Sequence, residues 1–347
     1  MWIVFAGCTI PSRERGHAVK MEWFMERMLK SRRIRLYVIS GVILVTGFLA
    51  MLFASTGYPE GIAEDPVYPA GRNMYTVYGV EIPDQVTFAG EIVPLDLFDV
   101  KEALDRELLS NTYFHSQTIR LIKLANRYFP QIEPVLRANL VPDDFKYLAV
   151  AESGLSQAVS PSKAVGFWQL LKGTAMEYGL EVGPEVDERY HIVKSTEVAC
   201  KYLIESFRKY GNWTMTAASY NAGRKGMDRQ IERQKTDNYY DLLLNEETAR
   251  YLYRVVAFKL IFEDPSAYGF NLSEKDLYPE IPVYRVEIDT SVASFADFAD
   301  ARGTNYKILK YLNPWLRDNK MSNPGRKTYE ILLPETGYRR PDAWLDQ

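Results

Sequence analysis

One glutamate in this sequence occupies a position where a buried helix would normally carry an apolar residue. In FKYLAVAESGL, residues 145–155, apolar side chains such as Phe145 and Leu148 recur with the period of a helix that buries one face. Glu152 continues that face, and Gly154 favours an end to the helix just after it. Burial and the partial negative charge of a helix C-terminus both disfavour a charged carboxylate. We therefore expect a raised pKa, which suits a general acid, although a glutamate that reaches from a helix end into solvent gives the same local pattern.

The sequence lacks the signatures of most other catalytic classes. It contains no H-E-x-x-H, no paired C-x-x-C, no G-x-S-x-G and no glycine-rich phosphate loop. The three histidines, His17, His115 and His191, are scattered, so neither a histidine-based triad nor a metal site is predicted. Residues 36–347 carry a net charge of −8, which argues against nucleic acid as the substrate. Once these classes are excluded, a catalytic mechanism based on a carboxylate is left.

The N-terminal part of the chain has the pattern of a membrane anchor. Residues 1–35 carry a net charge of +5 and precede 23 uncharged residues, 36–58, a length that can span a bilayer. Basic residues before the span and none close behind it predict a cytoplasmic N-terminus and an exported body. A cleaved signal peptide is the alternative, but the run is long for one and no clean A-x-A site follows it.

Proline content and helical patterns divide the rest of the chain. Residues 59–96 contain five prolines and are expected to form a tether with short extended pieces. Residues 97–265 predict a compact helical domain with one irregular loop after Glu152. A second linker is expected over 266–281, followed by a small β-α-α-β module over 282–335. The predicted fold class is therefore mainly α.

Within the helical domain, caps and periodicity predict individual helices. These are expected over residues 143–152, 173–178, 196–209, 214–221 and 246–262. Ser195 is the expected N-cap of the helix over residues 196–209, and Asn245 is the expected N-cap of the helix over 246–262. A short hairpin is expected within the loop, around VGFWQLL.

Four segments of this domain resemble, in order and spacing, the motifs of the Slt-type lytic transglycosylase domain, the family that includes goose-type lysozymes. The segments are AESGL, SPSKAVGFWQLLKGTA, AASYNAG and NEETARYLYRVVA, at residues 151–155, 160–175, 217–223 and 245–257. VPDDFKYLAVAESGL and EVDERYHIVKSTEVACKYL extend the match across most of 97–262. The resemblance implies a lysozyme-like helical fold for the domain.

The resemblance also implies a role for individual residues. Glu152 would be the family's single catalytic acid and base, with Ser153 as its neighbour in the E-S pair. The glycine and glutamine of a G-x-x-Q motif would admit the sugar and bond its polar groups, and a Tyr-Asn pair and a further tyrosine would complete the site. These residues are Gly166, Gln169, Tyr220, Asn221 and Tyr251. Phe167 and Trp168 are candidates for stacking on a sugar, or equally for the core.

The activity implied by the resemblance is cleavage of peptidoglycan between N-acetylmuramic acid and N-acetylglucosamine, with closure of a 1,6-anhydro ring. It would use no second carboxylate from the matched motifs, no metal and no organic cofactor. The partners would be glycan strands and, through the anchor, a membrane, with the catalytic domain in the periplasm of a bacterium. A muramidase that uses water and a catalytically idle wall-binding scaffold remain alternatives.

The C-terminal module resembles LysM, a glycan-binding β-α-α-β fold. Asn313-Pro314 and the closing YEILLP carry this resemblance. Glycan binding and a purely packing role both stay open for the module.

Overall fold

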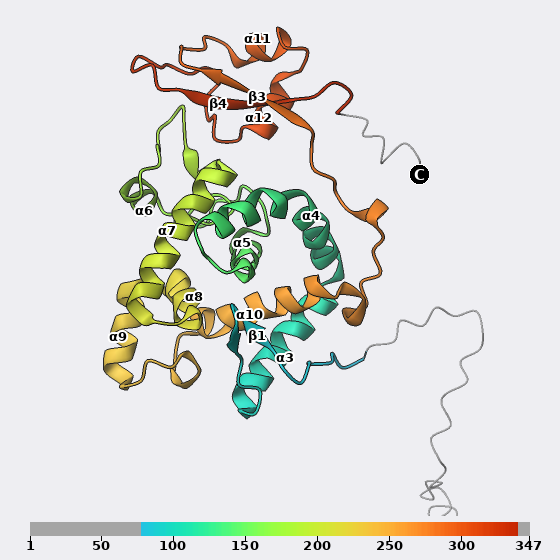
Figure 1. Ribbon diagram of the computed structural model, residues 1–347, viewed down its shortest axis with the longest axis vertical. Helices are drawn as coiled ribbons and strands as arrows, with labels where there is room; N and C mark the ends of the chain where they lie inside the picture. The colour runs from blue at the N-terminus through green and yellow to red at the C-terminus, as the bar shows by residue number, and fades with distance from the viewer. Residues whose placement is uncertain (1–77, 339–347) are drawn as a thin grey trace, which may run out of the picture. The chain divides into compact units, whose positions relative to one another are not determined.

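The computed structural model describes residues 78–338, which lie within one compact unit (Figure 1). The predicted basic N-terminus, residues 1–35, the predicted anchor, residues 36–58, and the first part of the predicted tether lie outside the described residues. No helix between residues 78 and 338 is long and apolar enough to cross a membrane.

Helices make up most of the first part of the described chain, as the sequence predicted. The longer ones are α3 (Phe98–Tyr113), α4 (His115–Ala138), α7 (Ile192–Tyr210) and α10 (Glu246–Glu263). The shorter ones are α5 (Lys146–Ser153), α6 (Lys172–Glu177), α8 (Trp213–Ala222) and α9 (Arg224–Gln234). The expected hairpin is present as bridges from Val165 to Val159 and to Leu170.

Helix α5 packs against α4 and α10 in this domain. Its residues Tyr147 to Val150 are all buried, and so is Phe145 in the 3-10 turn Asp143–Phe145 before it. The helix ends as predicted at Gly154, which has a left-handed φ of 59° and donates its N–H to Val150. The chain thus brings Glu152 to the edge of the core in the last turn of a short, well-fixed helix.

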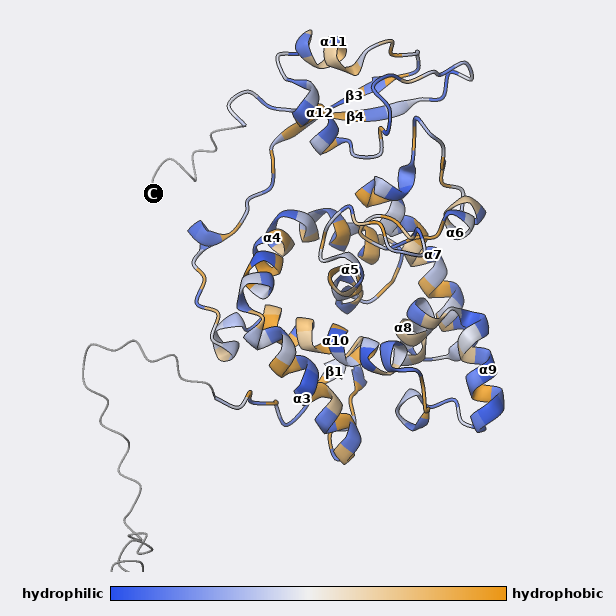
Figure 2. Ribbon diagram, turned by 180° about the vertical axis from the view of Figure 1, so that it is seen from behind, coloured by the Kyte–Doolittle hydropathy of each residue, from blue (hydrophilic) through white to orange (hydrophobic). Residues whose placement is uncertain are grey.

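One helical prediction needs correction, and one helix was not predicted. Helix α7 begins at Ile192 and is capped by the His191 ring, whose Nδ1 accepts from the Lys194 N–H at 3.4 Å. Ser195 lies inside the helix and bonds the Ile192 carbonyl instead, a local bond that serines make within helices as well as at caps. Helix α9 was not predicted, because its sequence is largely hydrophilic (Figure 2) and buries only Met227.

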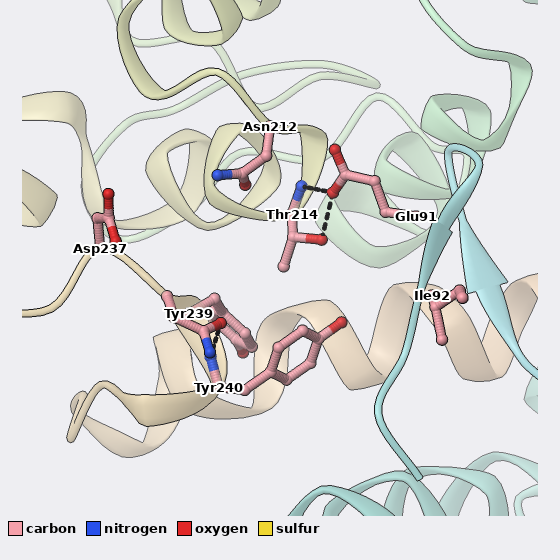
Figure 3. A pocket seen from close by; sticks show the side chains of 8 residues that line it. Glu91, Ile92, Asn212, Thr214, Asp237, Tyr239 and Tyr240 are labelled. Carbon is pink, nitrogen blue, oxygen red and sulfur yellow. Dashed lines mark hydrogen bonds between the residues drawn. The ribbon is translucent and has the colours of Figure 1, made fainter.

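A short hairpin, β1 (Thr87–Phe88) and β2 (Glu91–Ile92), packs on the helical domain. Phe88 is fully buried with its ring 5.2 Å from that of Phe145. Glu91 accepts a hydrogen bond from the backbone N–H of Thr214 at 2.8 Å (Figure 3) and another from that of Trp213 at 2.5 Å, so it caps α8. Residues 86–93, which the sequence assigned to the tether, are therefore part of the folded domain.

The predicted second linker follows the surface of α4. Its short 3-10 turns are η4 (Pro265–Tyr268) and η5 (Glu274–Asp276). Arg127 donates from Nε to the Pro279 carbonyl at 2.9 Å, and its guanidinium lies over the Tyr278 ring at 5.2 Å. The segment is thus held along a helix rather than standing free.

The C-terminal module has the predicted β-α-α-β order. Strands β3 (Val283–Ile288) and β4 (Tyr329–Pro334) pair antiparallel, from Val283 opposite Pro334 to Ile288 opposite Tyr329. Helices α11 (Phe295–Asp300) and α12 (Tyr306–Leu312) lie between them in sequence. The buried side chains of Phe295, Leu309, Ile331 and Leu333 form the centre of its core.

Candidate functional site

Glu152 lies at the centre of the candidate site. The Tyr251 hydroxyl, presented by α10, donates a hydrogen bond to Glu152 Oε1 at 2.7 Å. Tyr251 is only 2% exposed, whereas the Glu152 side chain keeps partial access to solvent. The carboxyl group is therefore held by a buried neighbour, while the residue that carries it is partly exposed.

Burial makes Glu152 a weaker acid than an exposed glutamate. Desolvation is the largest influence and, with the negative charge of Glu247, raises the pKa of Glu152 to about 7; the Tyr251 hydrogen bond and the positive charge of Arg254 act in the opposite direction. The predicted direction is confirmed, and burial is confirmed as its main cause. Glu247, which lies in the last of the matched motifs, acts on Glu152 through its negative charge, an effect that the sequence did not predict. The expectation that the reaction uses no second carboxylate from these motifs stays a prediction.

A buried glutamate on α3 pairs with two arginines of α10, one of which, Arg254, acts on Glu152. Glu107 is 1% exposed and pairs with Arg250 Nε at 2.6 Å and with Arg254 Nε at 3.5 Å. Both arginines flank Tyr251 on α10. Glu107 therefore ties α10, the helix that carries Tyr251, to α3. The sequence pattern of α3 did not predict this role.

The loop between α5 and α6 carries two predicted site residues in left-handed backbone conformations. Gly166 has φ 78°, and a Cβ there would lie 2.3 Å from the Arg189 carbonyl oxygen. The glycine thus admits a protein carbonyl. Gln169 has φ 46°, and its Nε2 donates to the carbonyls of Ala158 (3.1 Å) and Gly166 (2.9 Å). Among the described residues, no donor reaches Gln169 Oε1, which leaves an acceptor for a ligand.

Helix α8 supplies the predicted Tyr-Asn pair. The Tyr220 hydroxyl donates to the Trp168 carbonyl at 2.7 Å. Burial raises the pKa of Tyr220, and the negative charge of Glu152 raises it further. Asn221 Oδ1 accepts from the Thr248 hydroxyl at 2.8 Å, and its Nδ2 donates to Glu247 at 3.3 Å. Tyr220 thus lies in the electrostatic neighbourhood of Glu152, while Asn221 ties α8 to the first turn of α10.

Three predicted site residues, Phe167, Trp168 and Ser153, bond or pack against other parts of the protein. Phe167 and Trp168 are 2% and 0% exposed, so the possibility that they stack on a sugar is wrong and the core alternative holds. Trp168 Nε1 donates to Thr196 at 2.8 Å, and Phe167 packs 4.9 Å from Tyr128. The Ser153 hydroxyl donates to the Ala149 carbonyl one turn back at 3.0 Å.

A separate cavity of about 150 Å³ lies beside the N-terminus of α8 (Figure 3). It is lined by Glu91, Ile92, Asn212, Thr214, Asp237, Asn238, Tyr239 and Tyr240, which include none of the predicted site residues. Within the described part of the chain, no group of three or more histidine, cysteine, aspartate or glutamate residues could hold a metal ion.

Comparisons with known proteins agree with the motif analysis. Residues 130–243 match the transglycosylase SLT domain, and residues 284–337 match the soluble lytic transglycosylase C-terminal LysM-like domain. Membrane-bound lytic murein transglycosylase D of Escherichia coli (strain K12) is 26% identical over 242 residues, which are 68% of this chain and 52% of that protein. The protein of the same name from Escherichia coli O6:H1 gives the same figures. The chain thus spans about half the length of the curated relatives it matches.

Proposed function

Because this chain carries the SLT domain of the lytic transglycosylases followed by a LysM-like domain, we propose that it cleaves peptidoglycan between N-acetylmuramic acid and N-acetylglucosamine and leaves a 1,6-anhydro end. One observation carries the proposal: a partly buried Glu152 with its pKa raised to about 7, held by a tyrosine hydroxyl. A carboxyl group with such a pKa can donate a proton and take one back near neutral pH.

The proposed reaction uses this one group twice. Protonated Glu152 gives its proton to the glycosidic oxygen as the bond from that oxygen to the muramoyl C1 breaks. The substrate's N-acetyl carbonyl stabilises the positive charge that develops at C1. The Glu152 carboxylate then removes the proton from the muramoyl 6-hydroxyl, whose oxygen bonds to C1. Because the attacking hydroxyl belongs to the same sugar, it needs no diffusion to reach C1.

The neighbours of Glu152 suit this cycle. The hydrogen bond from Tyr251 favours the charged form, which exists between the two proton transfers. The free Oε1 of Gln169 can accept a hydrogen bond from a sugar hydroxyl or amide. Tyr220 and Asn221 hold, respectively, the loop at Trp168 and the start of α10, and so maintain the shape of the site.

The location of the proposed activity follows from the N-terminal pattern. The uncharged run at residues 36–58 would hold the chain in a membrane, and the basic residues 1–35 would remain in the cytoplasm. The catalytic domain would then lie in the periplasm of a bacterium, where peptidoglycan is found.

Product analysis tests the proposed function directly. Sacculi digested by the full chain should release muropeptides that end in 1,6-anhydromuramic acid, identified by mass spectrometry and by their failure to react with borohydride. A muramidase that uses water would instead yield reducing ends that borohydride converts to alcohols. Reducing ends as the main product would refute the transglycosylase assignment.

Glu247 gives the hydrolytic alternative a specific basis, since glycosidases with two carboxylates can use the second one to activate water. Under the single-acid mechanism, Glu247→Gln should leave kcat near its normal value at low pH. Its lost negative charge should lower the pKa of Glu152, so activity should begin to fall at a lower pH. Loss of a catalytic base would instead reduce kcat by about 10²- to 10⁴-fold.

The adjacent Glu246 supplies the matched control for this test. It is exposed and pairs with Arg250 at 3.2 Å. Glu246→Gln should change neither kcat nor the pH profile. The measurement is kcat and kcat/KM from pH 4 to 9 for both variants; a loss of kcat at every pH for Glu247→Gln alone would favour the two-carboxylate reaction.

A further inference from the structure

Residues 181–191, here called the bridging segment, lie between the C-terminal module and the loop that carries Gly166 and Gln169. The backbone of the segment pairs with the module: the Asp187 N–H donates to the Trp315 carbonyl at 2.9 Å, and the Arg317 N–H donates to the Glu185 carbonyl at 2.7 Å. The module is therefore bonded to the helical domain by main-chain groups.

Side chains extend this contact. Val186 and Tyr190 of the bridging segment, with Val165 of the loop, belong to the same buried cluster as the module residues Trp315 and Leu316. The core of the module thus continues into the helical domain, and separating the two would expose apolar surface to water.

Charged groups surround this apolar contact. Lys327 of the module pairs with Glu181 at 2.7 Å and with Glu188 at 3.4 Å. The Arg317 guanidinium lies 3.9 Å from the centroid of the Tyr190 ring. Such contacts are individually weak where solvent reaches them, but they fix the register of the module on the segment.

Arg189 of the bridging segment holds the loop that carries Gly166 and Gln169. Asp187 binds this guanidinium with two hydrogen bonds, at 2.7 and 3.0 Å, and both side chains are buried. Arg189 Nη1 donates to the carbonyls of Lys163 and Leu170, each at 3.2 Å. These carbonyls stand on either side of Gly166, which itself packs on the Arg189 carbonyl. One residue therefore fixes both ends of the turn.

We propose that Arg189 is a positioning residue for the Gly166–Gln169 turn, and that the C-terminal module holds this turn in its binding shape by clamping the bridging segment. Gln169 has a left-handed backbone, a conformation that persists in a non-glycine residue only where the surroundings enforce it. Loosening the segment would let the turn relax and move the Gln169 amide. The inference rests on the proposed function only for its activity readout.

The module offers matched variants for the test. Arg317→Ala with Lys327→Ala removes two cations that face the bridging segment. Arg302→Ala with Arg326→Ala removes two cations that act inside the module, where Arg302 lies 3.6 Å from the Phe298 ring centroid and Arg326 pairs with Asp289 at 3.1 Å. All four side chains are exposed, so neither pair of changes should unfold the module.

Hydrogen exchange on the full chain gives the first readout and requires no activity. The amides of Val165, Gly166 and Leu170 are bonded within the loop. They should exchange about tenfold faster in the interface variant and at the normal rate in the internal variant. Equal exchange in the two variants would overturn the clamp, whether or not the protein cleaves peptidoglycan.

Kinetics with a short glycan gives the second readout. Arg189→Lys keeps the charge but loses the planar fork that reaches Asp187 and both carbonyls. The KM should rise about tenfold, an effect expected from a small displacement of a binding group, while the pH profile set by Glu152 stays unchanged. A lower melting temperature with normal KM would assign Arg189 a purely structural role and refute the proposal. If the normal chain makes no product, the proposed function fails, and the exchange result still decides the clamp.

Discussion

Glu152→Gln should lower kcat by about 10³- to 10⁴-fold, the upper range for the loss of a general acid–base group. Glutamine has nearly the same shape and can still accept the hydrogen bond from Tyr251, which is 2.7 Å long in the native protein. It can neither give a proton to the glycosidic oxygen nor take one from the 6-hydroxyl. Both steps of the proposed reaction therefore fail together, without a change in the packing around the site.

Binding separates this result from a general loss of structure. The variant should sediment with purified sacculi as well as the normal chain does, because Gln169, Tyr220 and the C-terminal module are unchanged. Glu177→Gln is the matched control, since Glu177 is an exposed glutamate in the last turn of the short helix α6. It should digest sacculi at the normal rate.

Two outcomes would contradict the mechanism. Digestion by Glu152→Gln at more than about a tenth of the normal rate would be too fast for the loss of the only acid. Absence of digestion by the normal chain, together with tight binding to sacculi, would favour the alternative of a wall-binding scaffold.

The central feature of the site was predictable because its causes are local in sequence. The apolar period through Phe145 and Leu148 predicts which face of α5 is buried, and Gly154 predicts where the helix ends. Those two facts suffice to place Glu152 at the edge of the core and to give the direction of its pKa shift. The strands of the C-terminal module were also predictable, because the pattern that indicates them is local in sequence.

The electrostatic surroundings of Glu152 were not predictable, because they come from distant parts of the chain. Glu247 and Arg254 act on Glu152 from α10, about a hundred residues later in the sequence. Glu107 reaches Arg254 from α3. The periodicity of a sequence does not predict which charged residues on separate helices will lie close together. Only the tertiary structure therefore shows which charges raise and which lower the pKa of Glu152.

The surroundings of the aromatic residues were not predictable for a different reason. Composition could not decide whether Phe167 and Trp168 face a ligand or the core, since large aromatic rings serve both purposes. The buried hydroxyl of Thr196 on α7 decides the matter for Trp168, because it accepts the indole N–H at 2.8 Å. Gly166 was expected to admit a sugar, but its neighbour is the Arg189 carbonyl, which comes from a segment whose position the sequence left unknown.

The same Glu152→Gln variant should be more stable than the normal chain at high pH and equally stable at low pH. The pKa of Glu152 is raised from 4.5 to about 7 in the folded protein. A raised folded-state pKa means that the stability associated with the protonated carboxyl is fully present below pH 4.5 and is lost as pH rises through 7. Ionisation of the partly buried carboxyl therefore destabilises the normal chain by about 3 kcal/mol, and glutamine, which does not ionise, avoids this loss.

Urea unfolding of the full chain at pH 4 and at pH 8.5 measures the difference, with Glu177→Gln as a control that should match the normal chain at both. The dependence on pH distinguishes linkage from packing: a change in packing alone would shift the free energy of unfolding by the same amount at each pH. A constant difference, or greater stability of the normal chain at pH 8.5, would mean that water reaches the carboxylate freely in the folded state. Glu152 would then be ionised at neutral pH and would lack the proton with which the proposed reaction begins.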